Sequence, residues 1–262
     1  MKLYKPLMLS LLVLLPPGVT LAESAGEKGL AIAVEADRRD KGFGDSSATL
    51  SMILRNKQRD ESTREVRVRT LEIEGDGDKS MSIFDSPPDV KGTAFLTFSH
   101  ITGPDDQWLY LPALKRVKRI SSKNKSGPFM GSEFAYEDIS SDEVEKYTYK
   151  YLRDEPCAEF DCFIIERYPV DKNSGYTRQQ VWIDKTEYRP HKIDYYDRKN
   201  AHLKTLTFHD YSQYLEKYWR AMRYEMVNHQ TGKSTTLLWQ EYQFRTGLTE
   251  RDFDKNSLKR AK

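Results

Sequence analysis

Five histidines and two cysteines are the side chains of this sequence best suited to bind a metal ion or to act as nucleophiles. The histidines are scattered, with no H-E-x-x-H arrangement and no close histidine–carboxylate pair; they are His100, His191, His202, His209 and His229. The chain also lacks the G-x-S-x-G sequence that presents a serine nucleophile, and its many carboxylates single out no acid–base pair. These patterns predict a protein that is not an enzyme and has no metal and no cofactor. A metal site and an exported hydrolase are the less favoured alternatives.

One segment imitates a phosphate-binding loop. Thr231-Gly232-Lys233-Ser234-Thr235 matches the end of the pattern G-x-x-x-x-G-K-[ST]. The first glycine of that pattern would fall at position 227, where the chain has Val227. The segment also lies between two predicted strands, whereas a phosphate-binding loop joins a strand to a helix. We therefore interpret it as a hairpin turn.

The two cysteines, Cys157 and Cys162, are separated by four residues. In an exported protein, the simplest interpretation of such a pair is a disulfide. The flanking segments Tyr147–Arg153 and Phe163–Tyr168 have the composition of strands, so the bridge would link the two arms of a hairpin. Its small loop limits the stabilisation to about 2 kcal/mol. A redox or metal site is the alternative, although the C-x-x-C spacing of redox sites is missing.

The stretch from Trp108 to Ile139 places hydrophobic residues in an unusual setting. An aromatic strand with Trp108 and Tyr110 comes first, and a long connection follows. That connection carries apolar residues beside glycines, namely Phe129, Met130, Phe134 and Tyr136. Because surface loops are usually polar, these side chains need an apolar partner, which is either the protein's own core or a hydrophobic ligand.

Between these two parts lies a basic run, in which cations alternate with Leu114, Val117 and Ile120. The four cations are Lys115, Arg116, Lys118 and Arg119. One interpretation is a solvated edge strand, since lysines at a sheet edge prevent aggregation. The other is a docking site for acidic lipid head groups or an acidic partner.

The N-terminus has the features of a secretion signal. Lys2 and Lys5 precede the apolar stretch 7–15, and Thr20-Leu21-Ala22 forms an acceptable cleavage site. Pro16-Pro17-Gly18 interrupts the apolar stretch too early for a membrane span, which needs about 20 residues. We expect residues 1–22 to be a cleaved signal peptide and the mature chain to be periplasmic, without a transmembrane segment.

Removal of that signal changes the charge balance. Residues 1–22 carry only Lys2 and Lys5, so the 42 Lys+Arg of the chain fall to 40 and equal the 40 Asp+Glu. A nucleic-acid-binding protein would show a clear basic excess, so no nucleic-acid partner is expected. Residues 23–262 are long enough for one large β domain, which we expect to be monomeric.

The periodicity of the chain predicts mainly β-structure. Residues 27–40 have helical spacing, and from Ser47 onward hydrophobic residues recur at every second position. About a dozen strands joined by short turns follow, and a last helix is expected over 249–258. So many strands must curl, close or split into layers. Aromatic residues gather on one face of several strands, which suits a large concave face or an ordinary aromatic core; examples are Tyr147, Tyr149, Tyr151, Trp239, Tyr242 and Phe244.

Three segments carry a resemblance to a known family. They are Gly92-Thr-Ala-Phe-Leu, then Asp106-Gln-Trp-Leu-Tyr-Leu-Pro-Ala-Leu-Lys-Arg-Val-Lys-Arg-Ile, then Lys125-Ser-Gly-Pro-Phe-Met-Gly-Ser-Glu-Phe-Ala-Tyr-Glu-Asp-Ile. The chain resembles the outer-membrane lipoprotein-sorting proteins, which are LolA/LolB-like and are associated with exporters of the resistance-nodulation-division (RND) type. The resemblance implies an α+β fold with one strongly curved antiparallel sheet, which forms a half-open β-barrel covered by a few helices.

The same resemblance implies a function. We expect a periplasmic carrier or chaperone that binds a lipid or lipidated protein in an apolar cavity and passes it toward the outer membrane, together with an RND-type exporter. On this hypothesis the residues that line the cavity or form its lid are Trp108, Tyr110, Phe129, Met130, Phe134 and Tyr136. The alternative is a non-enzymatic accessory partner of an exporter that binds no ligand.

Overall fold

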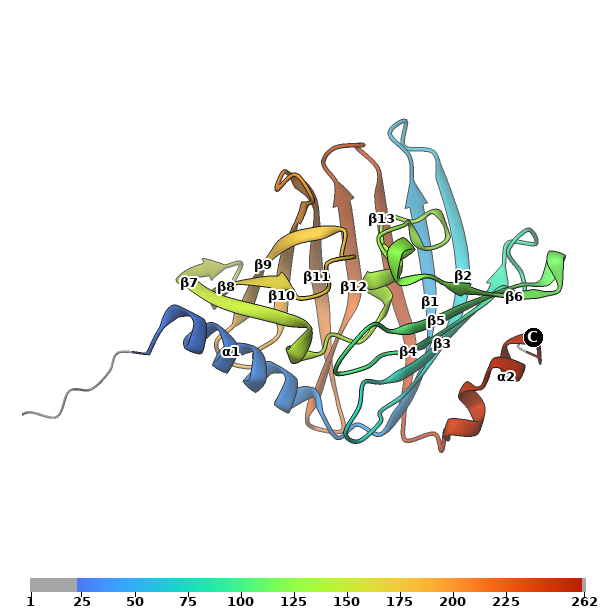
Figure 1. The fold of residues 1–262 in the computed structure, drawn as a ribbon, viewed down its shortest axis with the longest axis horizontal. Helices are drawn as coiled ribbons and strands as arrows, with labels where there is room; N and C mark the ends of the chain where they lie inside the picture. The colour runs from blue at the N-terminus through green and yellow to red at the C-terminus, as the bar shows by residue number, and fades with distance from the viewer. Residues whose placement is uncertain (1–22, 261–262) are drawn as a thin grey trace, which may run out of the picture.

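A single antiparallel sheet of 13 strands forms the framework of the protein (Figure 1). The computed structural model describes residues 23–260, so the predicted signal peptide of residues 1–22 lies outside the described residues. The strands of the first half are β1 (Asp45–Arg55), β2 (Glu61–Leu71), β3 (Lys79–Ser86), β4 (Ala94–Phe98), β5 (Asp106–Leu111) and β6 (Arg116–Ile120). Those of the second half are β7 (Tyr147–Cys157), β8 (Phe160–Pro169), β9 (Tyr176–Asp184), β10 (Pro190–Asp197), β11 (His202–Tyr214), β12 (Tyr218–Asn228) and β13 (Ser234–Phe244).

Two meanders make up the sheet, and they meet where β1 pairs with β13. The spatial order is β6-β5-β4-β3-β2-β1-β13-β12-β11-β10-β9-β8-β7. Leu50 of β1 lies opposite Trp239 of β13 on one side and Val66 of β2 on the other. Strands β6 and β7 are therefore the two edges, and the sheet curves without closing. This confirms the predicted half-open antiparallel barrel.

Residues 121–146, here called the bridging segment, connect β6 at one edge to β7 at the other. The segment must therefore pass across the open side of the curved sheet (Figure 1). Its only regular structure is four short 3₁₀ turns: η2 (Ser122–Asn124), η3 (Phe129–Gly131), η4 (Tyr136–Ile139) and η5 (Val144–Lys146). A fifth turn, η1 (Pro112–Leu114), joins β5 to β6.

Helix α1 (Ala25–Asp40) lies beside β7 and shields that edge. The Ser24 side chain caps it by accepting a hydrogen bond from the backbone N–H of Glu27. In turn, the Glu27 carboxylate accepts a hydrogen bond from the backbone N–H of Ser24. The helix predicted over 27–40 is thus confirmed and begins two residues earlier.

The C-terminal helix predicted over 249–258 is divided in two. The chain forms the 3₁₀ turn η6 (Glu250–Phe253) and then helix α2 (Lys255–Arg260). Asp254 separates them in an extended conformation, and its carboxylate accepts hydrogen bonds from the backbones of Asn256 and Ser257. An aspartate in this position starts a new helix, which the helical spacing alone did not reveal.

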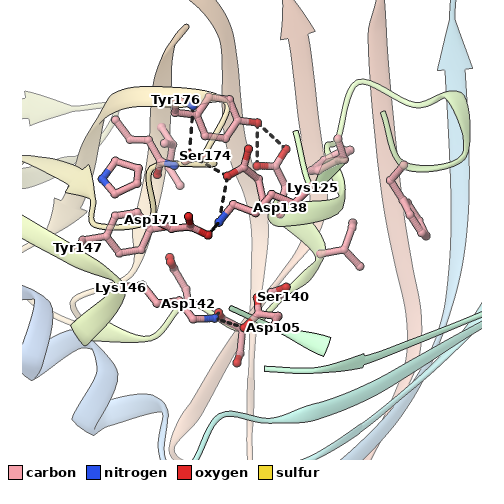
Figure 2. Close-up of a pocket in the computed structure, with 18 of the residues that line it drawn as sticks. Asp105, Lys125, Asp138, Ser140, Asp142, Lys146, Tyr147, Asp171, Ser174 and Tyr176 are labelled. Carbon is pink, nitrogen blue, oxygen red and sulfur yellow. Dashed lines mark hydrogen bonds and ion pairs between the residues drawn. The ribbon is translucent and has the colours of Figure 1, made fainter. Parts of the chain in front are cut away.

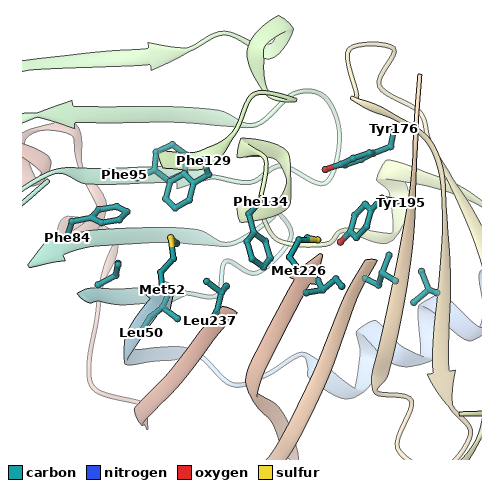
Figure 3. Close-up of a cluster of buried hydrophobic side chains, with 14 of the residues drawn as sticks. Leu50, Met52, Phe84, Phe95, Phe129, Phe134, Tyr176, Tyr195, Met226 and Leu237 are labelled. Atoms are coloured by element: carbon teal, nitrogen blue, oxygen red, sulfur yellow. The ribbon is translucent and has the colours of Figure 1, made fainter. Parts of the chain in front are cut away.

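Each face of the sheet has its own hydrophobic cluster. The concave cluster includes side chains from strands at both ends of the order, among them Leu50, Met52, Phe84, Phe95, Ile193, Leu206, Met226 and Leu237 (Figure 3). On the outer face, α2 and η6 cover β3–β6, where Phe253 and Leu258 pack against Met81 and Leu96. Alternation along each strand separates the two clusters.

Cys157 and Cys162 form the predicted disulfide, with their Cα atoms 5.9 Å apart. Cys157 ends β7 and Cys162 lies near the start of β8, so the bridge joins the two arms of a hairpin as expected.

Gly29 allows α1 to approach the edge strand closely. A Cβ atom at this position would lie 2.7 Å from the backbone nitrogen of Tyr151 and 2.9 Å from the carbonyl carbon of Lys150. We predict that Gly29→Ala lowers the free energy of unfolding by about 1–3 kcal/mol, because helix or strand must shift. In Gly26→Ala the new methyl group meets only ordinary contacts, the nearest at 3.7 Å, so this variant should be neutral or more stable. Urea unfolding measures both; equal effects would contradict the close packing.

Candidate functional site

A large hollow occupies the concave face and has two adjoining parts. The part beneath the bridging segment, here called the loop lobe, has a volume of about 890 Å³. The part beneath α1, the helix lobe, has a volume of about 1260 Å³. Side chains that line both lobes include Arg167, Ile193, Phe208, Tyr224 and Trp239, so the lobes adjoin. Ligand sites usually measure about 300–1,000 Å³, so the hollow can hold a sizeable molecule.

The bridging segment covers the loop lobe with its own hydrophobic residues. Phe129 and Phe134 are 2% and 3% exposed, and both point into the concave cluster (Figure 3). The Phe129 ring lies 5.0 Å from that of Phe95. A small hairpin directs the two rings, because Pro128 pairs with Ala135 and the Phe129 N–H donates to the Phe134 carbonyl at 2.7 Å. The two phenylalanines fill the mouth of the barrel, yet the space beneath them remains open.

The other predicted cavity or lid residues divide into two groups. Met130 and Tyr136 are partly buried against the concave cluster, close to Phe129 and Phe134. Trp108 and Tyr110 instead pack on the outer face, in the cluster covered by α2. This differs from the expected lining position, and the reason is the alternation along β5, where Leu109 and Leu111 are the side chains that face the concave cluster. Of the six predicted residues, only Phe129 and Phe134 line the hollow, and Met130 and Tyr136 pack beside them.

A buried ion pair fastens the bridging segment to the sheet. The ammonium group of Lys204 on β11 donates to the Asp138 carboxylate at 2.7 Å and to the Glu133 carbonyl at 2.8 Å. The side chains of Lys204 and Asp138 are only 4% and 6% exposed. The Tyr176 hydroxyl also donates to Asp138 at 2.9 Å (Figure 2). Burial and the adjacent carboxylate raise the pKa of Tyr176, so its hydroxyl stays protonated.

Further polar contacts surround the loop lobe. Lys125 pairs with Asp171 at 2.8 Å, and Lys146 pairs with Asp105 at 2.7 Å (Figure 2). Glu137 accepts hydrogen bonds from the Ser174 hydroxyl and the Gly175 backbone, both at 2.8 Å, while burial raises the pKa of its carboxyl. The rim of the loop lobe is thus polar and its floor apolar.

In the helix lobe, aromatic rings and paired charges lie beside aliphatic side chains such as Ile165, Val181 and Ile183. Trp239 contacts Tyr242 and Tyr224, with ring centroids 5.5 and 5.9 Å apart. Arg167 is nearly buried, donates to Gln179 at 2.7 Å and pairs with Asp142. Burial alone would lower the pKa of Arg167, but Asp142 opposes it and the pKa is raised overall, so the guanidinium stays charged.

The acidic mouth of the helix lobe contains a carboxyl with unusual protonation. Burial, reinforced by Glu143 and Glu72, raises the pKa of Asp78 to about 7. Burial also raises the pKa of Glu143.

The basic run forms the outermost strand of the sheet. Lys115 precedes β6 with a positive φ of 49°, and Arg116, Lys118 and Arg119 are exposed along β6. Arg119 is paired with Asp106, and the neighbouring Leu114 is 63% exposed. The position agrees with the edge-strand interpretation and also leaves the cations free to meet a partner.

Neither metal binding nor membrane spanning has a visible basis among residues 23–260. No group of three or more histidine, cysteine or acidic side chains in this part of the chain is arranged to hold a metal ion. Its helices are all too short or too polar to cross a bilayer.

Sequence reasoning missed the helix lobe and the buried ion pair. The relevant signal was the aromatic pattern of the strands, since Trp239 and Tyr242 were noted on one face. Lys204 and Asp138 carried no signal, because 66 residues separate them and both residue types are common.

Known structures share this architecture. The crystal structure of a LolA superfamily protein from Nitrosomonas europaea superposes with a TM-score of 0.71 over 87% of this chain and 98% of that chain, at 20% identity. The half-open sheet with a covered concave face is therefore a fold that this chain shares with that protein.

Two more similar structures identify the family. An outer membrane lipoprotein-sorting protein domain, as its crystal structure is named, from Vibrio parahaemolyticus is 64% identical, with a TM-score of 0.88 over 89% of this chain and 99% of that chain. A DUF1329 family protein from Desulfovibrio piger is 30% identical, with a TM-score of 0.85 over 90% of this chain and 99% of that one. A family model described as "Uncharacterized protein" matches residues 76–260, and no curated protein matches.

The chain belongs to the family of these two relatives, the outer-membrane lipoprotein-sorting proteins, as the sequence motifs predicted.

The buried ion pair can be tested with Lys204→Met. This change leaves the Asp138 carboxylate buried without a counter-charge, so we predict a loss of about 3 kcal/mol in the free energy of unfolding and faster hydrogen exchange over residues 127–140. Lys125→Met is the matched control, because its pair with Asp171 is more exposed and should contribute about 1 kcal/mol or less. Similar losses in the two variants would show that the buried pair does not hold the segment.

Proposed function

We propose that this protein is a periplasmic carrier that binds a lipid or the acyl chains of a lipidated protein and passes its cargo toward the outer membrane. The role is non-enzymatic. The observation that supports it most directly is the apolar hollow, which stays open although Phe129 and Phe134 occupy its mouth.

The energetics of such a site are favourable. Burial of one chain methylene contributes about 0.8 kcal/mol, so a long acyl chain gains on the order of 10 kcal/mol before ordering costs. The floor of the loop lobe offers Leu50, Met52, Val66, Leu206 and Leu237 for these contacts. The acyl chain itself needs no charged group for binding.

On this proposal the bridging segment acts as a lid. Phe129, Met130, Phe134 and Tyr136 cover the loop lobe and separate an incoming hydrocarbon chain from water. The basic run, Lys115–Arg119, supplies the contact with acidic lipid head groups or with an acidic partner. Its place on a free edge supports that role, because no other strand covers it.

The relatives support the proposed cargo and location. One relative is named for outer membrane lipoprotein sorting, which supports lipoproteins as cargo and the periplasm as location. The link to an RND-type exporter rests on the family resemblance alone, and the monomeric state is likewise proposed.

A second candidate is an accessory that docks on an exporter and binds no ligand. The burial of Phe129 and Phe134 favours it, since these rings already satisfy much of the concave cluster. The two candidates differ in what the hollow contains in the cell.

Native mass spectrometry of protein purified from its own periplasm tests the carrier. We predict lipid adducts on the unchanged protein and their loss in Leu237→Trp, which fills the loop lobe. Leu238→Trp is the control, because the next residue of β13 faces the opposite side and should leave the adducts in place. Protein free of lipid that still binds an exporter would favour the accessory instead.

Charge reversal tests the basic run. Changing all four of its cations to glutamate should weaken binding to anionic vesicles at least tenfold, because each cation near such a surface contributes about 1 kcal/mol. Thermal unfolding should change little, since these side chains are exposed. A control reverses exposed cations of two other turns, Lys57, Arg59 and Lys233. Unchanged vesicle binding and transport would count against the docking role.

A further inference from the structure

The hollow contains hydrogen-bonding groups that a plain acyl chain would leave unused. The indole nitrogen of Trp239 is shielded from solvent and has no hydrogen-bond partner among the described residues. Trp239 lines both lobes. A buried donor without a partner is costly, so a native site that keeps one calls for an explanation.

Three tyrosine hydroxyls at the hollow are also unpartnered, but unlike the indole nitrogen they are not sealed from solvent. Tyr195 lines the loop lobe, Tyr224 lines both lobes and Tyr242 lines the helix lobe, and within residues 23–260 their hydroxyls make no hydrogen bond. Other tyrosines are bonded: the Tyr149 hydroxyl donates to the Val144 carbonyl at 3.0 Å, and that of Tyr176 donates to Asp138. Burial raises the pKa of all three lining tyrosines, so they stay protonated and remain donors.

The arginines of the helix lobe, by contrast, are paired. Arg167 pairs with Asp142, and Arg220 pairs with Asp40 at the end of α1. Arg189 pairs with the fully buried Asp184 at 2.8 Å. An anionic ligand would therefore find no free arginine among these three, while the uncharged hydroxyls of Tyr224 and Tyr242 are open to the hollow.

The two lobes share part of their aromatic lining. Trp239 and Tyr224 line both lobes, and Tyr242 extends this ring cluster into the helix lobe, whereas Leu50, Met52, Val66 and Leu237 line the loop lobe alone. Aromatic rings with polar atoms suit a ligand part that is neither wholly apolar nor charged.

We propose that the helix lobe binds the uncharged, hydrogen-bonding head group of an amphiphile whose hydrocarbon tail lies in the loop lobe. Tyr224, Tyr242 and Trp239, which line the helix lobe, supply the donors. Sugar hydroxyls and peptide amides are two sources of this chemistry. The inference rests on the proposed carrier function and specifies which amphiphile the carrier prefers.

Probes with one dodecyl-length chain and different head groups test the inference. They are dodecyl maltoside, the lauroyl amide of a neutral dipeptide amide, dodecyl phosphate, dodecylamine and methyl laurate, each used below its micellar concentration. Affinities come from displacement of a fluorescent fatty-acid analogue from the full protein. At least one of the two neutral polar heads should bind about tenfold or more tightly than methyl laurate. The neutral probe that binds more tightly shows whether sugar hydroxyls or peptide amides are the preferred head group.

Trp239→Phe isolates the donor. This substitution should weaken binding of the preferred neutral probe about tenfold, which is the usual effect of losing one hydrogen bond. Binding of methyl laurate should be unchanged. Its thermal stability should stay equal or rise, since an unpaired buried donor is removed. Trp182→Phe is the matched control, because that indole donates to Glu155 at 2.6 Å outside the hollow, and its probe affinities should not change.

Three results would overturn the inference. They are equal binding of all head groups, tightest binding of a charged head group, and equal weakening of every probe by Trp239→Phe. If methyl laurate binds but polar heads add nothing, the head-group inference fails and the carrier stands. If no probe binds, the carrier proposal fails as well.

Discussion

The pairing of β1 with β13 is the constraint on which the rest of the structure depends. Because the first and last strands meet in the middle of the sheet, the chain between them must start at one edge and resume at the other. Residues 121–146 have to make that passage, and the only route lies across the open side of the curve. A cover over the concave face is thus a product of strand order. Its hydrophobic residues are buried because the topology places them above an apolar floor.

Both apolar and polar contacts hold this cover in place. Phe129 and Phe134 give it an apolar underside, while the Lys204–Asp138 pair fixes its position on β11. A buried ion pair adds little net stability compared with apolar packing, but it tolerates few alternative arrangements. The same hollow can therefore be covered in a defined way without being filled. Beneath α1 the walls also carry Tyr242 and the paired side chains of Arg189 and Arg220, none of which lines the loop lobe.

Much of the fold was predictable from the sequence, because alternation and short turns act locally. The strands, the N-terminal helix and the Cys157–Cys162 bridge all followed from nearby residues. The site was predicted only in part. The loop phenylalanines stood out by their composition, whereas Trp108 was placed on the wrong face because an isolated strand does not say which of its sides is concave. The Lys204–Asp138 contact depends on the curvature of the whole sheet, and no local pattern encodes it.

The bridging segment has one mechanical property that bears on transport. A strap that continues into a strand at each end cannot swing aside like a hinged flap. Lys204 also holds its middle through Glu133 and Asp138, so this contact must break before Phe129 and Phe134 can lift. On the proposed carrier function the gap then lies along the sides of the strap, where a slender hydrocarbon chain can pass while a folded polypeptide attached to it stays outside. Cargo size is in this way limited only for the part that enters.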